Sequence, residues 1–138
     1  MILDEKNNQE IQQKYMEMQM IDQQLQAISQ HLANFDNQLS EINDTKKALD
    51  DLSKVEEGSE TLVTIASGIF AKAKITDVKN LKVNVGGNVV VEKDVESTKK
   101  LLDNQMSEVE RAKGQLLSQF EQLSQKNMGL QETLKDLS

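Results

Sequence analysis

The sequence predicts an α+β protein, in which a long antiparallel two-helix coiled coil carries two β-hairpins at its base. Two heptad series flank a block of short β-branched runs, and the 138 residues contain no proline that would interrupt a helix. Aromatic residues make up only 3% of the chain, charged residues make up 28%, and the mean hydropathy is −0.57. This composition favours burial along a helical seam over a large compact core.

The first helix is expected over residues 5–56, where apolar residues recur at alternating spacings of three and four. Polar residues fill most of the other positions, as the solvated face of a coiled coil requires. Lys14 and Lys46 are polar interruptions of the series. The expected a positions are Ile11, Met18, Leu25, Leu32, Leu39 and Lys46, and the d positions are Lys14, Ile21, Ile28, Phe35, Ile42 and Leu49.

The second helix is expected over residues 94–137, with its own heptad series. Lys113 and Asn127 fall at a positions, where polar residues lower stability but fix register and partner choice. Gly129 is expected to loosen the final two turns, because glycine is a poor helix former. The d positions are Val95, Leu102, Val109, Leu116, Leu123, Leu130 and Leu137, and the a positions are Lys99, Met106, Lys113, Phe120, Asn127 and Leu134.

Two β-hairpins are expected over residues 60–92, as one oligomerisation platform within a single subunit. Gly58 ends the first helix, Asp94 caps the second, and the hairpin turns are expected at residues 66–68 and 86–88. So small a sheet leaves an apolar face and bare edges, which other subunits must cover. The apolar residues expected at those contacts are Leu62, Val63, Ile65, Ile69, Phe70, Ile75, Leu81, Val83, Val85, Val89 and Val91.

Residues 61–93 resemble the central hairpins of archaeal prefoldin alpha subunits, and the flanking heptads extend the resemblance over nearly the whole chain. Thr64 departs from the family, in which proline is common at this position. The resemblance implies a hexamer of two alpha and four beta subunits, whose hairpins complete a double β-barrel. The matching residues are Leu62-Val63, Gly68 followed by Phe70, Lys72-Ala73, Asp77, Val83 and Val85 before Gly86, and Val91-Glu92-Lys93.

The resemblance also implies a chaperone function. Prefoldin captures unfolded or nascent polypeptides at its coiled-coil tips without ATP and transfers them to a group II chaperonin. No cofactor and no enzymatic activity are expected, and the protein is expected in the cytoplasm. The hairpin lysines are either a contact for an acidic patch on the chaperonin or a solvated strand face; they are Lys72, Lys74, Lys79 and Lys82.

Apolar residues near the free helix ends are the expected client-binding tips, because off-seam residues stay exposed and seam ends fray. Methionine is enriched there, and its flexible thioether suits surfaces that accept many apolar partners. The alternative is that Met and Tyr line a helix contact. Deletion of residues 1–10 and 129–138 is expected to abolish client holding but to leave the hexamer intact. The tip residues are Ile2, Leu3, Ile11, Tyr15, Met16, Met18, Met20, Met128, Leu130, Leu134 and Leu137.

The charge balance and residue inventory exclude other classes of function. A net charge of −7 disfavours binding to nucleic acid and to anionic membranes. The chain has no cysteine, and His31 is its single histidine, so no metal site or catalytic triad is expected. The competing hypothesis is a coiled-coil scaffold or a filament-forming, prefoldin-like protein.

Overall fold

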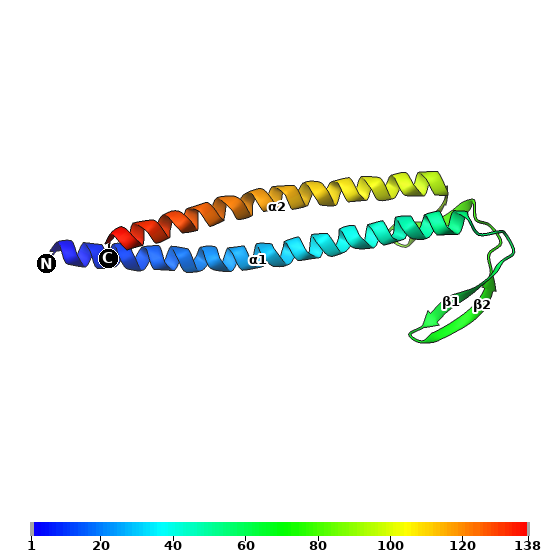
Figure 1. Ribbon diagram of the computed structural model, residues 1–138, viewed down its shortest axis with the longest axis horizontal. Coiled ribbons are helices and arrows are strands. Elements are labelled where there is room, and N and C mark those ends of the chain that lie inside the picture. Colours follow the sequence, from blue (N-terminus) through cyan, green and yellow to red (C-terminus); the bar gives the residue numbers. More distant parts are fainter. Residues whose placement is uncertain (1, 138) are drawn as a thin grey trace. The chain divides into compact units, whose positions relative to one another are not determined.

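The structure is a computed structural model that describes residues 2–137, with side chains described from Glu5 to Leu137. In chain order, four strands lie between two long helices, which confirms the α+β prediction (Figure 1). The first helix starts and ends a few residues earlier than expected. In chain order the elements are α1 (Ile2–Ser53), β1 (Glu60–Ala66), β2 (Ile69–Lys74), β3 (Asn80–Gly86), β4 (Val89–Asp94) and α2 (Val95–Leu137).

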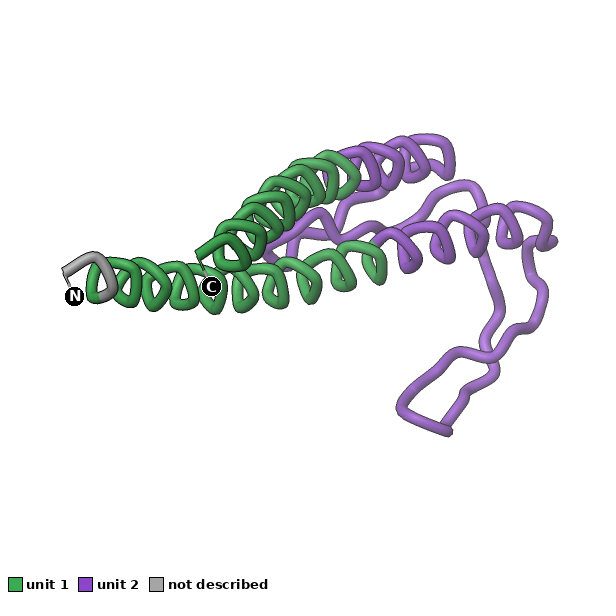
Figure 2. The backbone as a smooth tube through the Cα atoms, turned by 60° about the vertical axis from the view of Figure 1, so that its left-hand side comes forward, with its two compact units in different colours: residues 1–38, 109–138 green, residues 39–108 purple. Residues whose placement is uncertain are grey.

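The chain divides into two compact units, which Figure 2 shows in green and purple. Unit 1 comprises residues 1–38 and 109–138, and therefore pairs the first part of α1 with the last part of α2. Unit 2 comprises residues 39–108 and contains the remaining helical segments and both hairpins.

Side-chain burial along both helices follows the predicted heptads. Every predicted a and d position among the described residues is buried or half-buried, including Lys14 and Lys46. The buried apolar core lies in unit 1 and consists of Ile21, Ile28, Leu130 and Leu134. The two heptad registers are therefore confirmed. The helix α2 continues past Gly129 to Leu137, and the loosening of its final turns stays a prediction.

Polar residues at a positions pair with aspartates on the opposite helix. In unit 1, Lys113 Nζ lies 2.5 Å from Asp36 Oδ1, and Asn127 Nδ2 donates a hydrogen bond of 2.9 Å to Asp22 Oδ1. Each aspartate directly follows a d position, so it lies at the edge of the seam. These contacts confirm the antiparallel pairing within unit 1.

Unit 2 repeats the arrangement. Lys46 Nζ lies 2.5 Å from Asp103 Oδ1, and Lys99 forms an ion pair with Asp50. The hydrogen bond from Lys99 lowers the pKa of the Asp50 carboxyl, and the same bond raises the pKa of the Lys99 ammonium. Along α1 the paired aspartates are spaced by two heptads, and so are their partners along α2: Asp22, Asp36 and Asp50 meet Asn127, Lys113 and Lys99.

Exchanging the charges of one such pair tests whether it fixes the register. Asp36→Lys or Lys113→Asp alone places like charges together and is expected to lower stability by up to about 1 kcal/mol. The double variant restores an ion pair and is expected to recover about 0.5 kcal/mol of that loss. Urea unfolding followed by circular dichroism measures this coupling. Additive effects of the two substitutions would show that the pair does not contribute to the pairing.

The two hairpins share one design. In the first, Leu62 pairs with Lys72 and Thr64 with Phe70, and in the second Lys82 pairs with Glu92. Each hairpin has a two-residue turn preceded by an irregularity in β1 or β3. In the second turn both Gly87 and Asn88 have positive φ values, of 57° and 62°, which a type I′ turn requires. The structure therefore confirms the predicted hairpins and turns.

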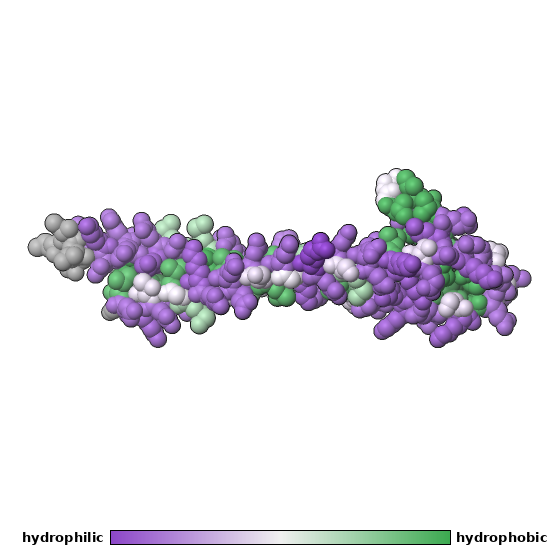
Figure 3. All heavy atoms as spheres, turned by 90° about the horizontal axis from the view of Figure 1, so that it is seen from above, coloured by the Kyte–Doolittle hydropathy of each residue, from purple (hydrophilic) through white to green (hydrophobic). Residues whose placement is uncertain are grey.

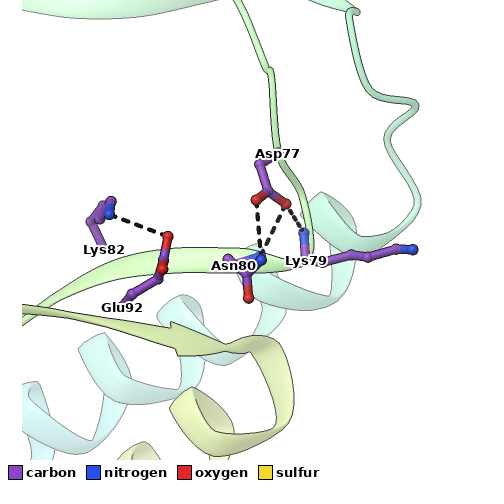
Figure 4. Close-up of polar contacts among 5 residues, drawn as sticks. All are labelled: Asp77, Lys79, Asn80, Lys82 and Glu92. Carbon is purple, nitrogen blue, oxygen red and sulfur yellow. Dashed lines mark hydrogen bonds and ion pairs between the residues drawn. The ribbon is translucent and has the colours of Figure 1, made fainter.

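Two aspartates shape the ends of the second hairpin. Asp77 Oδ1 accepts hydrogen bonds from the backbone N–H groups of Lys79 and Asn80, at 2.8 and 3.1 Å (Figure 4). These bonds, with that from Lys79 the strongest, lower the pKa of the Asp77 carboxyl. Asp94 caps α2 as predicted: its Oδ1 accepts a 2.7 Å bond from the Ser97 N–H, which lowers its pKa.

Candidate functional site

Four large apolar side chains near the chain ends of unit 1 are exposed to solvent. We define the tip as residues 5–20 of α1 and 128–137 of α2. Tyr15, Met16, Met20 and Met128 are 56%, 64%, 61% and 62% exposed. These positions lie off the seam, so the paired helix does not cover them. The methionine side chains are flexible and polarisable, which suits contact with apolar groups of varied shape.

A groove of about 410 Å³ lies between the two helices at the tip. Tyr15 and Met18 line it from α1, and Met128 and Leu134 line it from α2. Gln131, Glu132 and Lys135 complete the lining with polar groups. The groove can therefore accommodate an apolar side chain and offers hydrogen-bonding groups at its rim.

The other predicted tip residues differ in exposure. Ile11, Met18 and Leu137 are half-buried seam residues, whereas Leu130 and Leu134 are buried in the core. Leu130 could meet a bound polypeptide only if the helices separated. The side chains of Ile2 and Leu3 lie outside the part of the chain that the structure describes.

The hairpins carry a further exposed apolar surface. Figure 3 shows apolar atoms gathered over the strands, while much of the helix surface is polar. Ile75, Leu81, Val83 and Val91 are half-buried within unit 2. The predicted contact residues that remain exposed in this chain are Leu62, Val63, Ile65, Ile69, Phe70, Val85 and Val89.

Val90 is an exposed hairpin residue that was not among the predicted contact residues. It is 57% exposed and pairs with Asn84, on the face of the second hairpin opposite to that of Val83 and Val91. The signal that identifies it is the two-residue turn at Gly87 and Asn88, which sets the register and therefore the face of each β4 residue.

The hairpin lysines are exposed, and one of them has a partner within its own hairpin. Lys82 Nζ lies 3.2 Å from Glu92 Oε1, across the strand pair (Figure 4). Both side chains are more than half exposed, so this ion pair contributes little to stability. Lys72 and Lys74 belong to β2, and Lys79 lies in the connection before β3. The lysines thus lie on different segments of the hairpin block.

Comparison with known sequences identifies the family. The sequence model described as prefoldin subunit matches residues 21–138. The chain belongs to the prefoldin family. Prefoldin subunit alpha from Methanopyrus kandleri is 33% identical to it over 81% of this chain and 74% of that protein. Prefoldin subunit alpha from Methanococcus aeolicus is 23% identical over 94% of this chain and 88% of that protein.

These relatives confirm the resemblance to archaeal prefoldin alpha subunits. A shorter match, with prefoldin subunit alpha from Methanothrix thermoacetophila, is 47% identical but covers only 40% of this chain and 36% of that protein. The fold also matches solved structures. A chain of filamentous prefoldin from Methanocaldococcus jannaschii aligns with a TM-score of 0.63 at 20% identity, over 88% of this chain and 94% of that one.

A second solved structure, the prefoldin beta subunit from Thermococcus strain KS-1, has a TM-score of 0.60 and 18% identity, over 92% of this chain and 90% of that one. At this identity the match concerns the prefoldin fold alone. In the described part of the chain, neither helix contains an apolar stretch long enough to cross a membrane.

The exposed tip and hairpin surfaces are the candidate binding surfaces of this prefoldin subunit.

Proposed function

We propose that this prefoldin subunit captures unfolded or nascent polypeptides at its coiled-coil tip without ATP, and that it transfers them to a group II chaperonin in the cytoplasm. The observation that carries the proposal is the exposed group of Tyr15, Met16, Met20 and Met128 beside the tip groove. Unfolded chains expose apolar side chains, and a methionine-rich surface can adapt to many of them. Engagement of several tips at once would raise the affinity of weak individual contacts.

We further propose that the hairpins assemble this subunit into a hexamer with beta-type subunits. Seven of the predicted hairpin residues are exposed in the isolated chain, and each sheet has only two strands. Two-stranded sheets are marginally stable in water, so additional strands from partner subunits would stabilise them. Completion of a β-barrel would also cover the open strand edges.

The main alternative is a prefoldin that forms open-ended filaments through the same hairpins. The similarity to a chain of filamentous prefoldin concerns the fold and therefore does not separate the two assemblies. Native mass measurement separates them. A mass of six chains that forms only on mixing with a beta-type subunit supports the hexamer, whereas open-ended growth of this chain alone supports the filament.

The tip is tested by the triple variant Met16→Gln, Met20→Gln and Met128→Gln. Because all three side chains are exposed, their replacement is expected to preserve folding and assembly. Suppression of client aggregation, measured by light scattering with the full chain and with the mixed complex, is expected to fall several-fold. This choice avoids the deletion of residues 129–138, which would also remove the buried Leu130 and Leu134.

Leu117→Gln provides the matched control. Leu117 is also exposed and also belongs to unit 1, but it lies outside the tip. This control is expected to suppress aggregation as well as the unmodified chain. Equal activity in the triple variant and the unmodified chain would contradict the proposed tip.

A further inference from the structure

Glutamine is distributed very unevenly between the two units. Residues 1–38 contain nine glutamines and residues 109–138 contain five, whereas residues 39–108 contain Gln105 alone. Helix propensity does not account for this difference, because Lys and Glu form helices about as well as Gln. The helical parts of unit 2 have solvated faces too, but these carry mainly Asp, Glu, Lys and Ser. The surface of unit 1 therefore carries more carboxamide side chains and a smaller share of charged ones than the helical parts of unit 2.

Several of these glutamines border grooves between the helices of unit 1. One groove, of about 550 Å³, has Ile28, Leu123 and Ala27 as its apolar lining, with Gln24, Gln119, Gln122 and Lys126 around them. A second groove, of about 530 Å³, combines Leu25 and Phe120 with Gln26, Gln30, Ser29 and Asp22. The tip groove contains Gln131. Each groove thus combines an apolar seam residue with at least one carboxamide.

The chemistry of this combination matches an extended polypeptide. A carboxamide has two N–H donors and a carbonyl acceptor, which can pair with the C=O and N–H groups of a peptide backbone. A folded protein has already paired most of those groups internally, whereas an unfolded chain presents them along its length. An apolar floor with carboxamide walls can therefore receive a side chain and hold the adjacent backbone, whatever the sequence.

The local charge agrees with an occupant that is not strongly acidic. Residues 1–38 contain six acidic residues and two lysines, whereas residues 109–138 contain four of each sign. The groove of Ile28 and Leu123 has a single charged residue, Lys126, in its lining. Carboxamides also bind without the salt dependence and charge selectivity of ion pairs. A surface of this kind favours contact with backbone, which every unfolded protein shares.

We propose that unit 1 binds extended, unfolded polypeptide backbone through its glutamine-bordered grooves, beyond the tip itself. This inference rests on the proposed function, because it extends the client surface from the tip residues along both paired helices. A client would then be held by the apolar tip and by carboxamide contacts further along unit 1.

A charge-matched pair of variants tests the inference. The groove variant carries Gln24→Glu, Gln119→Glu and Gln122→Glu, which replaces three carboxamides by carboxylates of nearly the same shape. The control variant carries Gln23→Glu, Gln115→Glu and Gln125→Glu, which adds the same charge at exposed positions of the same helices outside these grooves. Neither variant alters a tip residue or a seam residue.

The measurement is fluorescence anisotropy of labelled, reduced and carboxymethylated lysozyme, a permanently unfolded probe, titrated with the full chain and with its mixed complex. The groove variant is expected to bind the probe about tenfold more weakly than the unmodified chain, and the control is expected to bind within about twofold. Equal affinities of the groove variant and the control would overturn the inference. Circular dichroism is expected to show that both variants remain helical.

A neutral variant separates loss of carboxamide from gain of charge. Gln24→Ala, Gln119→Ala and Gln122→Ala preserve helix propensity and add no charge, and this variant is also expected to bind more weakly. Unchanged affinity in it would overturn the inference even if the groove variant were weakened. If neither the unmodified chain nor its complex bound the probe, the proposed function itself would fail. If the unmodified chain bound the probe and the groove variants bound it equally well, only this inference would fail.

Discussion

Phe70→Asp is expected to prevent this chain from assembling with a beta-type subunit. Phe70 is 58% exposed in the isolated chain and lies on the same face of the first hairpin as Leu62, which is also exposed. A phenylalanine buries 150–250 Å² in a typical interface, so its loss removes a large apolar contribution. The introduced carboxylate would in addition have to be buried without a partner, which costs several kcal/mol. Native mass spectrometry after mixing is expected to show separate chains.

Leu117→Asp is the control for that substitution, because it also replaces an exposed apolar residue by aspartate but lies on α2 in unit 1. It is expected to assemble normally. Circular dichroism of Phe70→Asp is expected to match that of the unmodified chain, since the helices do not depend on an exposed hairpin side chain. Normal assembly of Phe70→Asp would show that the first hairpin does not contribute this face to a subunit contact.

Ile21→Ala is expected to be the most destabilising single truncation in the helical seam. Ile21 is only 5% exposed, the lowest value among the four residues of the apolar core. Truncation of a buried isoleucine to alanine typically costs about 2–5 kcal/mol, and a narrow seam that can partly collapse favours the lower end of that range. Urea unfolding followed by circular dichroism measures the loss.

Hydrogen exchange adds spatial information to the Ile21→Ala experiment. Exchange is expected to accelerate in residues 1–38 and 109–138, while the helical parts of unit 2 are expected to change less. Gln23→Ala, an exposed position on the same helix, is expected to change stability by less than about 0.5 kcal/mol. A loss below about 1 kcal/mol in Ile21→Ala would contradict the burial-based account of the seam.

The helical seam and the hairpins were predictable because each depends on a local, periodic signal. The heptad pattern assigned Lys14 and Lys46 to seam positions despite their charge, and both side chains are half-buried. The turn residues Gly87 and Asn88 specified the second hairpin through their tolerance of positive φ. Both predictions used only the spacing of neighbouring residues.

Contacts between segments distant in the sequence were not predictable in the same way. Lys113 and Asn127 were expected to influence register. Their partners Asp36 and Asp22 depend on the axial alignment of the two helices. A heptad pattern does not determine that alignment, because a shift by a whole heptad gives the same pattern. The exposure of Val90 required the hairpin register. The glutamine-bordered grooves required both helices at once, because each groove takes residues from α1 and α2.

The two-heptad spacing of the paired aspartates bears on the order in which the chain folds. If one helix slid past the other by two heptads, Asp36 would meet Asn127 and Asp50 would meet Lys113, so most of the polar pairing would form again out of alignment. The polar pairs between the helices therefore disfavour this misalignment only weakly. The hairpin block between Ser53 and Val95 joins the two helices, and its fixed length limits how far one helix can slide along the other. We expect the helices to close progressively from that block, so that residues at the chain ends find their partners last.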